Sequence, residues 1–186
     1  PISGLLAFGS TLVTAPSANA VDVDGIWGEG TTVALQQFLN QALGAGLEVD
    51  GLIGSQPASA QQELAVFGSG WDWVSDSDAS GSATITAMQN WLGVSADGLI
   101  GRQTLSALGS YEDPELGREI DELNRELGEL GRFVEGVGED VQRKYEDIKN
   151  KLKELYEEVI RKLQDMLDKL SGKPDPEARK WFEEHR

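Results

Sequence analysis

Apolar residues recur at helical spacing in two similar stretches of the chain, residues 31–40 and 84–93. Their positions place them on one face of an α-helix, so each stretch is predicted to be a helix that packs by this face against a core. Ser82 or Thr84 suits the N-cap of the second helix. The apolar positions are Ala34, Leu35, Phe38 and Leu39 in the first copy, and Ala87, Met88, Trp91 and Leu92 in the second.

Two shorter helices are expected after these. Pro57 fits the first turn of a helix that runs to about Phe67, where a Gly-Ser-Gly run follows. The equivalent helix in the second copy covers Gln103–Leu108, and Gly109 is expected to end it.

A short run with turn chemistry accompanies these helices. Asp-Gly-Leu-Ile-Gly occurs at residues 50–54 and again at 97–101, and a looser copy, Asp-Gly-Ile-Trp-Gly, occupies residues 24–28. The aspartate side chain can accept hydrogen bonds from nearby backbone amides, and glycine adopts positive φ without a Cβ clash. We therefore predict three tight loops that orient successive helices, with Asp24, Asp50 and Asp97 as loop caps.

The second part of the chain has a different periodicity. From residue 116 to 170, apolar positions alternate at steps of three and four, a period typical of packed or coiled helices. The alternation shifts near Val141, after a Gly-Val-Gly-Glu-Asp run. This pattern predicts two antiparallel helices, about 113–135 and 139–171, with one continuous helix as the alternative.

The polar positions of residues 111–186 resemble idealised, computationally designed helical sequence. The resemblance rests on an Asp-Pro-Glu start at 113–115, dense Glu and Lys on the surface positions, and a Ser-Gly-Lys-Pro-Asp-Pro-Glu connector before a short final helix with Trp181 and Phe182. A natural coiled-coil or helical interaction domain is the alternative. Three glycines share one heptad position beside the apolar seam and predict either close helix approach or local bends: Gly117, Gly131 and Gly138.

Composition divides the chain near residue 110. Residues 1–110 hold ten acidic residues and one basic residue, whereas residues 111–186 hold 22 acidic and 15 basic residues. We therefore expect two parts of different origin: a helical domain at 1–110 and a charged helical hairpin with a short terminal helix at 111–186. The predicted fold class is all-α, a small helical repeat domain with Asp-Gly loops followed by a long helical hairpin or coiled-coil-like segment.

Charge and residue content restrict the function classes. The formal net charge is −16 at pH 7, whereas nucleic acid and anionic membranes both bind basic surfaces. No apolar run approaches the roughly 18 residues needed to cross a bilayer. The chain has no cysteine and a single histidine, His185, which argues against thiolate metal sites and His-based triads. We expect no nucleic-acid or membrane partner, no metal or cofactor, and no catalytic residues.

The internal repeat extends beyond the loops. Ala-Leu-Gln-Gln-Phe-Leu at 34–39 is followed by Gly-Leu-Glu-Val-Asp-Gly-Leu-Ile-Gly at 46–54, and the second copy closes with Ala-Asp-Gly-Leu-Ile-Gly-Arg-Gln-Thr at 96–104. These residues make the stretch 21–110 resemble the peptidoglycan-binding repeat domain of bacterial cell-wall hydrolases. The resemblance implies a small helical bundle, secreted or at the cell wall, that holds a wall glycan or its stem peptide. Pro57 stands where that family has a threonine, and the first helix of the first unit is short or missing.

Aromatic residues of this part supply candidate ligand contacts. An indole ring offers a flat apolar face to the C–H surface of a sugar. Trp71 and Trp73 lie in a Gly, Ser and Asp-rich loop where exposure is expected, and Trp27 lies in a turn. Core packing is the alternative for each. Arg102, the single cation of this part, is a candidate contact for a carboxylate, with a solvated loop residue as its alternative.

Asp76 and Asp78 complete the set of candidate ligand contacts. Their alternation resembles the opening of a calcium-binding loop, in which oxygen ligands at alternate positions wrap the cation. The twelfth position, however, is Ala87, and the bidentate glutamate of such loops is missing. We therefore expect a solvated loop and no metal site.

Residues 1–20 have two interpretations. The apolar run that begins at residue 4 and ends in Ala-Asn-Ala resembles the end of a secretory signal, with cleavage before Val21. The run Leu-Ala-Phe-Gly-Ser at 6–10 also resembles residues 64–69, which favours a segment packed on the domain.

Together these patterns predict a noncatalytic module that binds a cell-wall glycan or stem peptide, with a helical segment that binds a protein partner or self-associates. The alternative is an engineered fusion, in which the helical segment is a designed protein binder, spacer or oligomerisation unit and the repeat domain is a scaffold. The resemblance implies a secreted or wall location for the repeat domain. For an engineered chain the location stays open.

Overall fold

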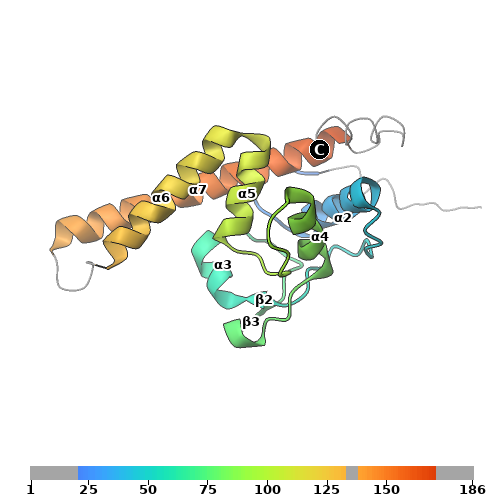
Figure 1. Ribbon diagram of the computed structural model, residues 1–186, viewed down its shortest axis with the longest axis horizontal. Helices are drawn as coiled ribbons and strands as arrows, with labels where there is room; N and C mark the ends of the chain where they lie inside the picture. Colours follow the sequence, from blue (N-terminus) through green and yellow to red (C-terminus); the bar gives the residue numbers. More distant parts are fainter. Residues whose placement is uncertain (1–20, 133–137, 171–186) are drawn as a thin grey trace, which may run out of the picture.

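The computed structural model of the chain describes residues 21–132 and 138–170, which are mostly helical (Figure 1). The all-α prediction is confirmed, because strands in these residues are limited to one two-stranded parallel pair and an isolated bridge. Residues 1–20 and the predicted final helix lie outside them. The elements are α2 (Glu29–Leu43), β2 (Gln56–Pro57), α3 (Ala58–Leu64), β3 (Trp73–Val74), η3 (Asp76–Asp78, a 3₁₀ turn), α4 (Ala83–Leu92), α5 (Arg102–Glu112), α6 (Pro114–Gly131) and α7 (Glu139–Leu170).

Side-chain caps begin two of these helices as predicted. At the start of α4, the backbone N of Thr84 donates to Ser82 Oγ at 3.1 Å. At the start of α6, the backbone N of Glu115 donates to Asp113 Oδ1 at 3.1 Å, and Pro114 is the first helical residue. Each cap satisfies an N–H group that has no partner within the helix and contributes about 1 kcal/mol.

Two helix ends differ from the prediction. Helix α3 ends at Leu64, earlier than expected, because Ala65 takes a left-handed conformation with φ of 53°. The prediction that Gly109 ends α5 is wrong, since the helix continues to Glu112. Gly109 is buried, and a Cβ atom there would lie 3.0 Å from Val159 Cγ2 of α7. This glycine allows two helices to approach closely instead of ending one of them.

Helices α6 and α7 form the predicted antiparallel pair, and the alternative of one continuous helix is wrong. Asn124 and Tyr156 are 32 residues apart, yet the Asn124 Nδ2 atom lies 3.1 Å from the Tyr156 hydroxyl. Helix α7 is the longer helix and packs on α2 and α5 as well as on α6. The far end of the pair projects away from the other helices (Figure 1).

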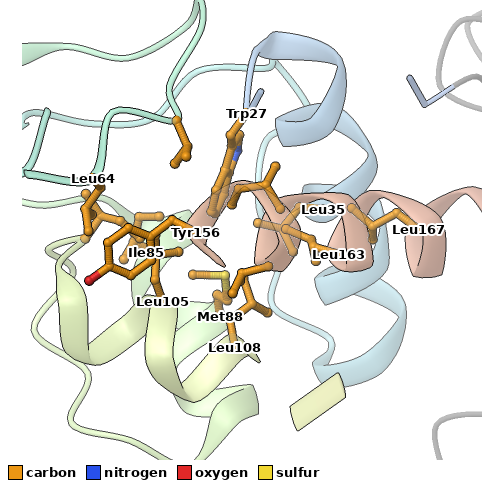
Figure 2. Packing of buried hydrophobic residues seen from close by; sticks show 14 of the residues in the cluster. Trp27, Leu35, Leu64, Ile85, Met88, Leu105, Leu108, Tyr156, Leu163 and Leu167 are labelled. Carbon is orange, nitrogen blue, oxygen red and sulfur yellow. The ribbon is translucent and has the colours of Figure 1, made fainter. Parts of the chain in front are cut away.

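The hydrophobic core runs across the compositional boundary near residue 110. Tyr156, Leu163 and Leu167 of α7 lie among Leu35 of α2, Ile85 and Met88 of α4, and the α5 leucines (Figure 2). Most of these side chains are almost fully buried, which makes α7 part of the same core as the repeat helices. The division into two parts of different origin is therefore a division in composition, with packing shared between them.

Gly117 occupies a close approach of α5 and α6. A Cβ atom at this position would lie 2.7 Å from the Ser110 Cβ and 2.8 Å from the Ser110 Cα. For Gly117, close approach of the chain is the interpretation that the structure supports. Gly131, which also shares the heptad position, lies against the Tyr145 ring, whereas Gly138 has open space around it.

Candidate binding site

A buried glutamine of α2 holds the second Asp-Gly loop in place. Gln36 Oε1 accepts hydrogen bonds from the backbone N atoms of Asp50 and Gly51, both at 3.0 Å. Its Nε2 lies within hydrogen-bond distance of Asp50 Oδ1, the carbonyl O of Leu52 and Thr84 Oγ1, at 3.0, 3.3 and 3.1 Å. We call this arrangement a glutamine clamp: one side-chain amide that joins a helix to the backbone of an Asp-Gly loop and to a threonine.

Gln89 of α4 forms the same clamp on the third loop. Its Oε1 accepts from the backbone N of Gly98 at 2.8 Å. Its Nε2 lies 2.9 Å from Asp97 Oδ1, 3.0 Å from the carbonyl O of Leu99 and 3.1 Å from Thr104 Oγ1. The two clamps therefore use the same kinds of atom, but the threonine differs in position. Thr104 lies seven residues after Asp97, whereas Thr84 lies on α4, beyond Pro57, which is seven residues after Asp50.

The first loop is clamped from α7, in the charged hairpin. Gln164 Oε1 accepts from the backbone N atoms of Asp24 and Gly25 at 3.0 and 2.9 Å. Its Nε2 lies 3.1 Å from Asp24 Oδ1, 2.8 Å from the carbonyl O of Ile26 and 2.9 Å from Thr31 Oγ1. Among the described residues, the helix that clamps the first loop is therefore α7, from the far end of the sequence.

The sequence contained a signal for this clamp that the heptad pattern obscured. The pattern apolar-Gln-x-x-Leu occurs at 35–39 and 88–92, and it recurs as Leu-Gln-Asp-Met-Leu at 163–167. In a helix this spacing places the glutamine beside the two apolar residues that enter the core. A comparison of the hairpin with the repeats, instead of with coiled coils, would have predicted Gln164 as a third member.

The three aspartates cap their loops as predicted. Asp24, Asp50 and Asp97 each accept, through Oδ1, a hydrogen bond from the backbone N two residues later, at 2.9 to 3.0 Å. The bond from the Leu52 N–H and the one from Gln36 lower the pKa of Asp50 below its ordinary value, because both favour the charged carboxylate. The clamps and caps explain the conformation of these loops without a ligand.

Trp27 lies inside the protein. Its side chain is fully buried, and its Nε1 donates to Thr32 Oγ1 at 2.9 Å. The ring also packs edge-on against Trp71, with centroids 5.1 Å apart. The geometry of Trp27 therefore favours the core-packing alternative, and Trp27 is not accessible to a ligand.

Trp71, Trp73 and Phe67 form a half-buried group that we call the aromatic shelf. The two indoles are stacked, with centroids 5.2 Å apart and planes at 7°. The Phe67 ring lies 4.4 Å from Trp71 and 4.9 Å from Trp73. Trp71 is also fixed by a hydrogen bond from its Nε1 to the carbonyl O of Trp27 at 2.8 Å. Trp73 thus has fewer ring contacts than Trp71 and is the outer member of the stack.

Asp76 and Asp78 close the turn that follows β3. Asp76 Oδ1 accepts from the backbone N of Ser59 at 3.1 Å, at the start of α3. Asp78 Oδ2 accepts from Ser75 Oγ at 2.8 Å. Within residues 21–132 and 138–170, no group of three or more His, Asp or Glu side chains is arranged to hold a metal ion.

Arg102 lies apart from the aromatic shelf, beside a pocket of about 530 Å³. Its Nε is 2.8 Å from Glu63 Oε1 of α3, and both side chains are about half exposed. The pocket lies where α3 and the first turn of α5 face the α6–α7 pair. It is lined by Ser59, Gln62, Glu63, Ala65, Arg102, Asn124, Leu127, Tyr145, Lys149, Asn150, Leu152, Lys153 and Tyr156.

The candidate contacts therefore fall into two places. Trp71 and Trp73 belong to the shelf with Asp76 and Asp78 in the adjoining segment, whereas Arg102 belongs to the pocket. No protein-family model, curated protein or solved structure matches the chain. In the described part of the chain, no helix is long and apolar enough to cross a membrane.

Proposed function

We propose that the chain is a noncatalytic binding module for a cell-wall glycan, with the aromatic shelf as its sugar-contacting surface. The observation that carries the proposal is the pair of stacked indoles, Trp71 and Trp73, held at the edge of a repeat domain that resembles wall-binding modules. Aromatic rings present an apolar face of the kind that stacks against a sugar. A secreted or wall location is part of the same proposal.

The preorganisation of the shelf supports this reading. Trp71 is held by a hydrogen bond and by three neighbouring rings, so little side-chain freedom remains to be lost when a ligand binds. The nearby carboxylates of Asp76 and Asp78 have structural partners, the Ser59 amide at the start of α3 and the Ser75 hydroxyl. A site built for acid–base chemistry instead requires a carboxyl group free to exchange a proton with the ligand, and binding without turnover is the simpler role.

A pull-down on purified, insoluble cell wall tests the proposal. The unaltered chain is expected to be retained, and Trp73→Ala to weaken retention by about fivefold, the factor that one aromatic contact of about 1 kcal/mol represents. Leu52→Ala is the matched control, because Leu52 is an exposed apolar residue outside the shelf. Circular dichroism checks that both variants keep their helices. Equal retention of Trp73→Ala and the unaltered chain would refute the shelf as the contact surface.

A second candidate function is that of a rigid scaffold, in which the hairpin mounts or binds another protein. The Gln164 clamp favours it, because a helix fixed both by a buried amide and by core packing cannot swing relative to the repeats. An engineered fusion would have this use. Absence of wall retention at every salt concentration would leave this candidate, and light scattering of the purified chain would then show whether the hairpin also self-associates.

A further inference from the structure

The pocket beside Arg102 has a charge opposite to that of the chain. Arg102, Lys149 and Lys153 line it together with one acid, Glu63, which gives the lining a formal charge of +2. The whole chain carries −16. A local excess of cations in a hollow of the surface raises the concentration of anions at that place.

The cations are presented toward the pocket by one face of α7. Tyr145, Lys149, Lys153 and Tyr156 follow one another at steps of four, four and three along this helix, and all line the pocket. Lys149 lies 3.9 Å from Glu146, a loose contact. Lys153 forms no ion pair with any residue of the described segments. At least one of these ammonium groups is therefore available to an incoming anion.

Neutral hydrogen-bonding groups also line the same pocket. The Tyr156 hydroxyl and the Asn124 amide are bonded to each other at 3.1 Å, which fixes their positions. Burial raises the pKa of Tyr156, so its hydroxyl stays protonated at neutral pH. Asn124 keeps further donor and acceptor capacity beyond this contact. Such groups suit the hydroxyls and amides of a sugar or a peptide.

We propose that this pocket is a binding site for a small carboxylate-bearing ligand, specifically an acidic amino sugar. The carboxylate would meet the ammonium groups of Lys149 and Lys153, and the sugar hydroxyls would meet Asn124, which the buried Tyr156 hydroxyl holds in place. The volume of about 530 Å³ falls in the range of roughly 300–1,000 Å³ that small-molecule sites occupy. The choice of a sugar as the ligand rests on the proposed function, whereas the choice of an anion rests on the pocket alone.

Two sugars that differ by the carboxylate test this site. N-Acetylmuramic acid carries a lactyl carboxylate on the ring of N-acetylglucosamine, which has none. In an amide NMR titration of the full chain, N-acetylmuramic acid is expected to shift the signals of Arg102, Lys149 and Lys153. N-Acetylglucosamine is expected to bind up to about fivefold more weakly, the factor of one exposed ion pair of about 1 kcal/mol.

Matched substitutions on α7 complete the test. Lys153→Gln is expected to weaken the binding of N-acetylmuramic acid about fivefold. Lys151→Gln removes the same charge from an exposed position outside the pocket and is expected to leave it unchanged. Equal effects of the two substitutions, equal binding of the two sugars, or no shifts at all would overturn the proposal.

The shelf variant separates this proposal from the proposed function. Trp73→Ala is expected to leave the pocket titration unchanged, because Trp73 does not line the pocket. Binding of the acidic sugar without retention on cell wall would refute the wall-binding function and leave the pocket. Retention on cell wall without pocket shifts would do the reverse.

Discussion

Replacement of Gln164 by methionine tests whether the hairpin is needed to hold the first Asp-Gly loop. Methionine has nearly the same length and shape as glutamine, so it keeps the packing of α7 and removes the amide. Five polar atoms lie within hydrogen-bond distance of that amide in the structure. Asp24 and Ile26 are exposed, so water can replace the amide as the hydrogen-bond partner of their polar atoms. Gly25 and Thr31 are buried, and water cannot do so there.

The expected cost follows from the two groups that water cannot reach. A buried donor or acceptor left without a partner costs about 1–3 kcal/mol. For the Gly25 N–H and the Thr31 hydroxyl together we expect Gln164→Met to lower the free energy of unfolding by about 3 kcal/mol. Urea denaturation followed by helical circular dichroism and by tryptophan fluorescence measures this change. The slope m is expected to stay the same, because the surface exposed on unfolding does not change.

Gln142→Met provides the matched control on the same helix. Gln142 is exposed near the start of α7, and its replacement is expected to change the free energy of unfolding by less than about 0.5 kcal/mol. Hydrogen exchange gives an independent readout, since the Gly25 amide is expected to exchange faster in Gln164→Met alone. A loss of stability no larger than in the control, or an unchanged Gly25 exchange rate, would refute the clamp as a stabilising contact.

Two further predictions concern a helix contact and a loop cap. Gly117→Ala is expected to destabilise the protein by about 1–3 kcal/mol, because its Cβ would overlap the backbone of Ser110. Gly128 has open space around it, so Gly128→Ala is expected to stabilise the protein by up to about 1 kcal/mol. Thermal unfolding measures both changes, and changes of the same sign would contradict the packing argument. The folded-state pKa of Asp50 is lowered from an ordinary value of 3.8, so its contribution to stability is fully present above that pH and is lost as pH falls through the lower folded value. Asp50→Asn should therefore flatten the loss of stability below that pH in acid titrations, and an unchanged acid profile would argue against the cap.

The elements that sequence reasoning predicted well are those fixed by local chemistry. Ser82 and Asp113 accept hydrogen bonds from amides two residues later, so a few neighbouring residues are enough to locate the starts of α4 and α6. The glycine at 109 shows where local rules fail. A glycine near a helix end commonly stops the helix, yet here its missing side chain admits Val159 from α7, a contact that no short stretch of sequence contains.

The largest gap between sequence and structure concerns the partner of the first loop. Gln164 and Asp24 are 140 residues apart, and they lie in segments of different composition. That difference in composition favoured a division into two separate parts. The heptad pattern of the second part then predicted only helix–helix packing and no role for the glutamine within it. The clamp depends on chemistry that is independent of the surface charges, which is why composition gave no sign of it.

The candidate site was predictable only in part for a similar reason. Trp27 and Trp73 lie in segments with equally turn-rich sequence, and burial separates them: Trp27 is fully buried, whereas Trp73 is half-buried on the shelf. The pocket requires α3 and Arg102 to meet Lys149 and Lys153, so it exists only once α7 is docked. Its residue type alone made Arg102 a candidate contact for a carboxylate. The other residues around it could be known only from the tertiary packing.

The hairpin therefore links the stability of the fold to any binding in the pocket. Helix α7 carries both Gln164, which fixes the first loop, and the lysines that line the pocket. A ligand that binds only the docked arrangement stabilises it by RT ln(1 + [L]/Kd), about 2.7 kcal/mol at a hundredfold excess over Kd. Such a ligand should thus recover most of the stability lost in Gln164→Met. When Lys153→Gln is added, the roughly fivefold weaker binding leaves about a twentyfold excess over Kd, and the recovery should fall to about 1.8 kcal/mol. A scaffold without a pocket ligand predicts no recovery in either variant, so one set of unfolding curves distinguishes a helix that only supports the fold from one that also binds.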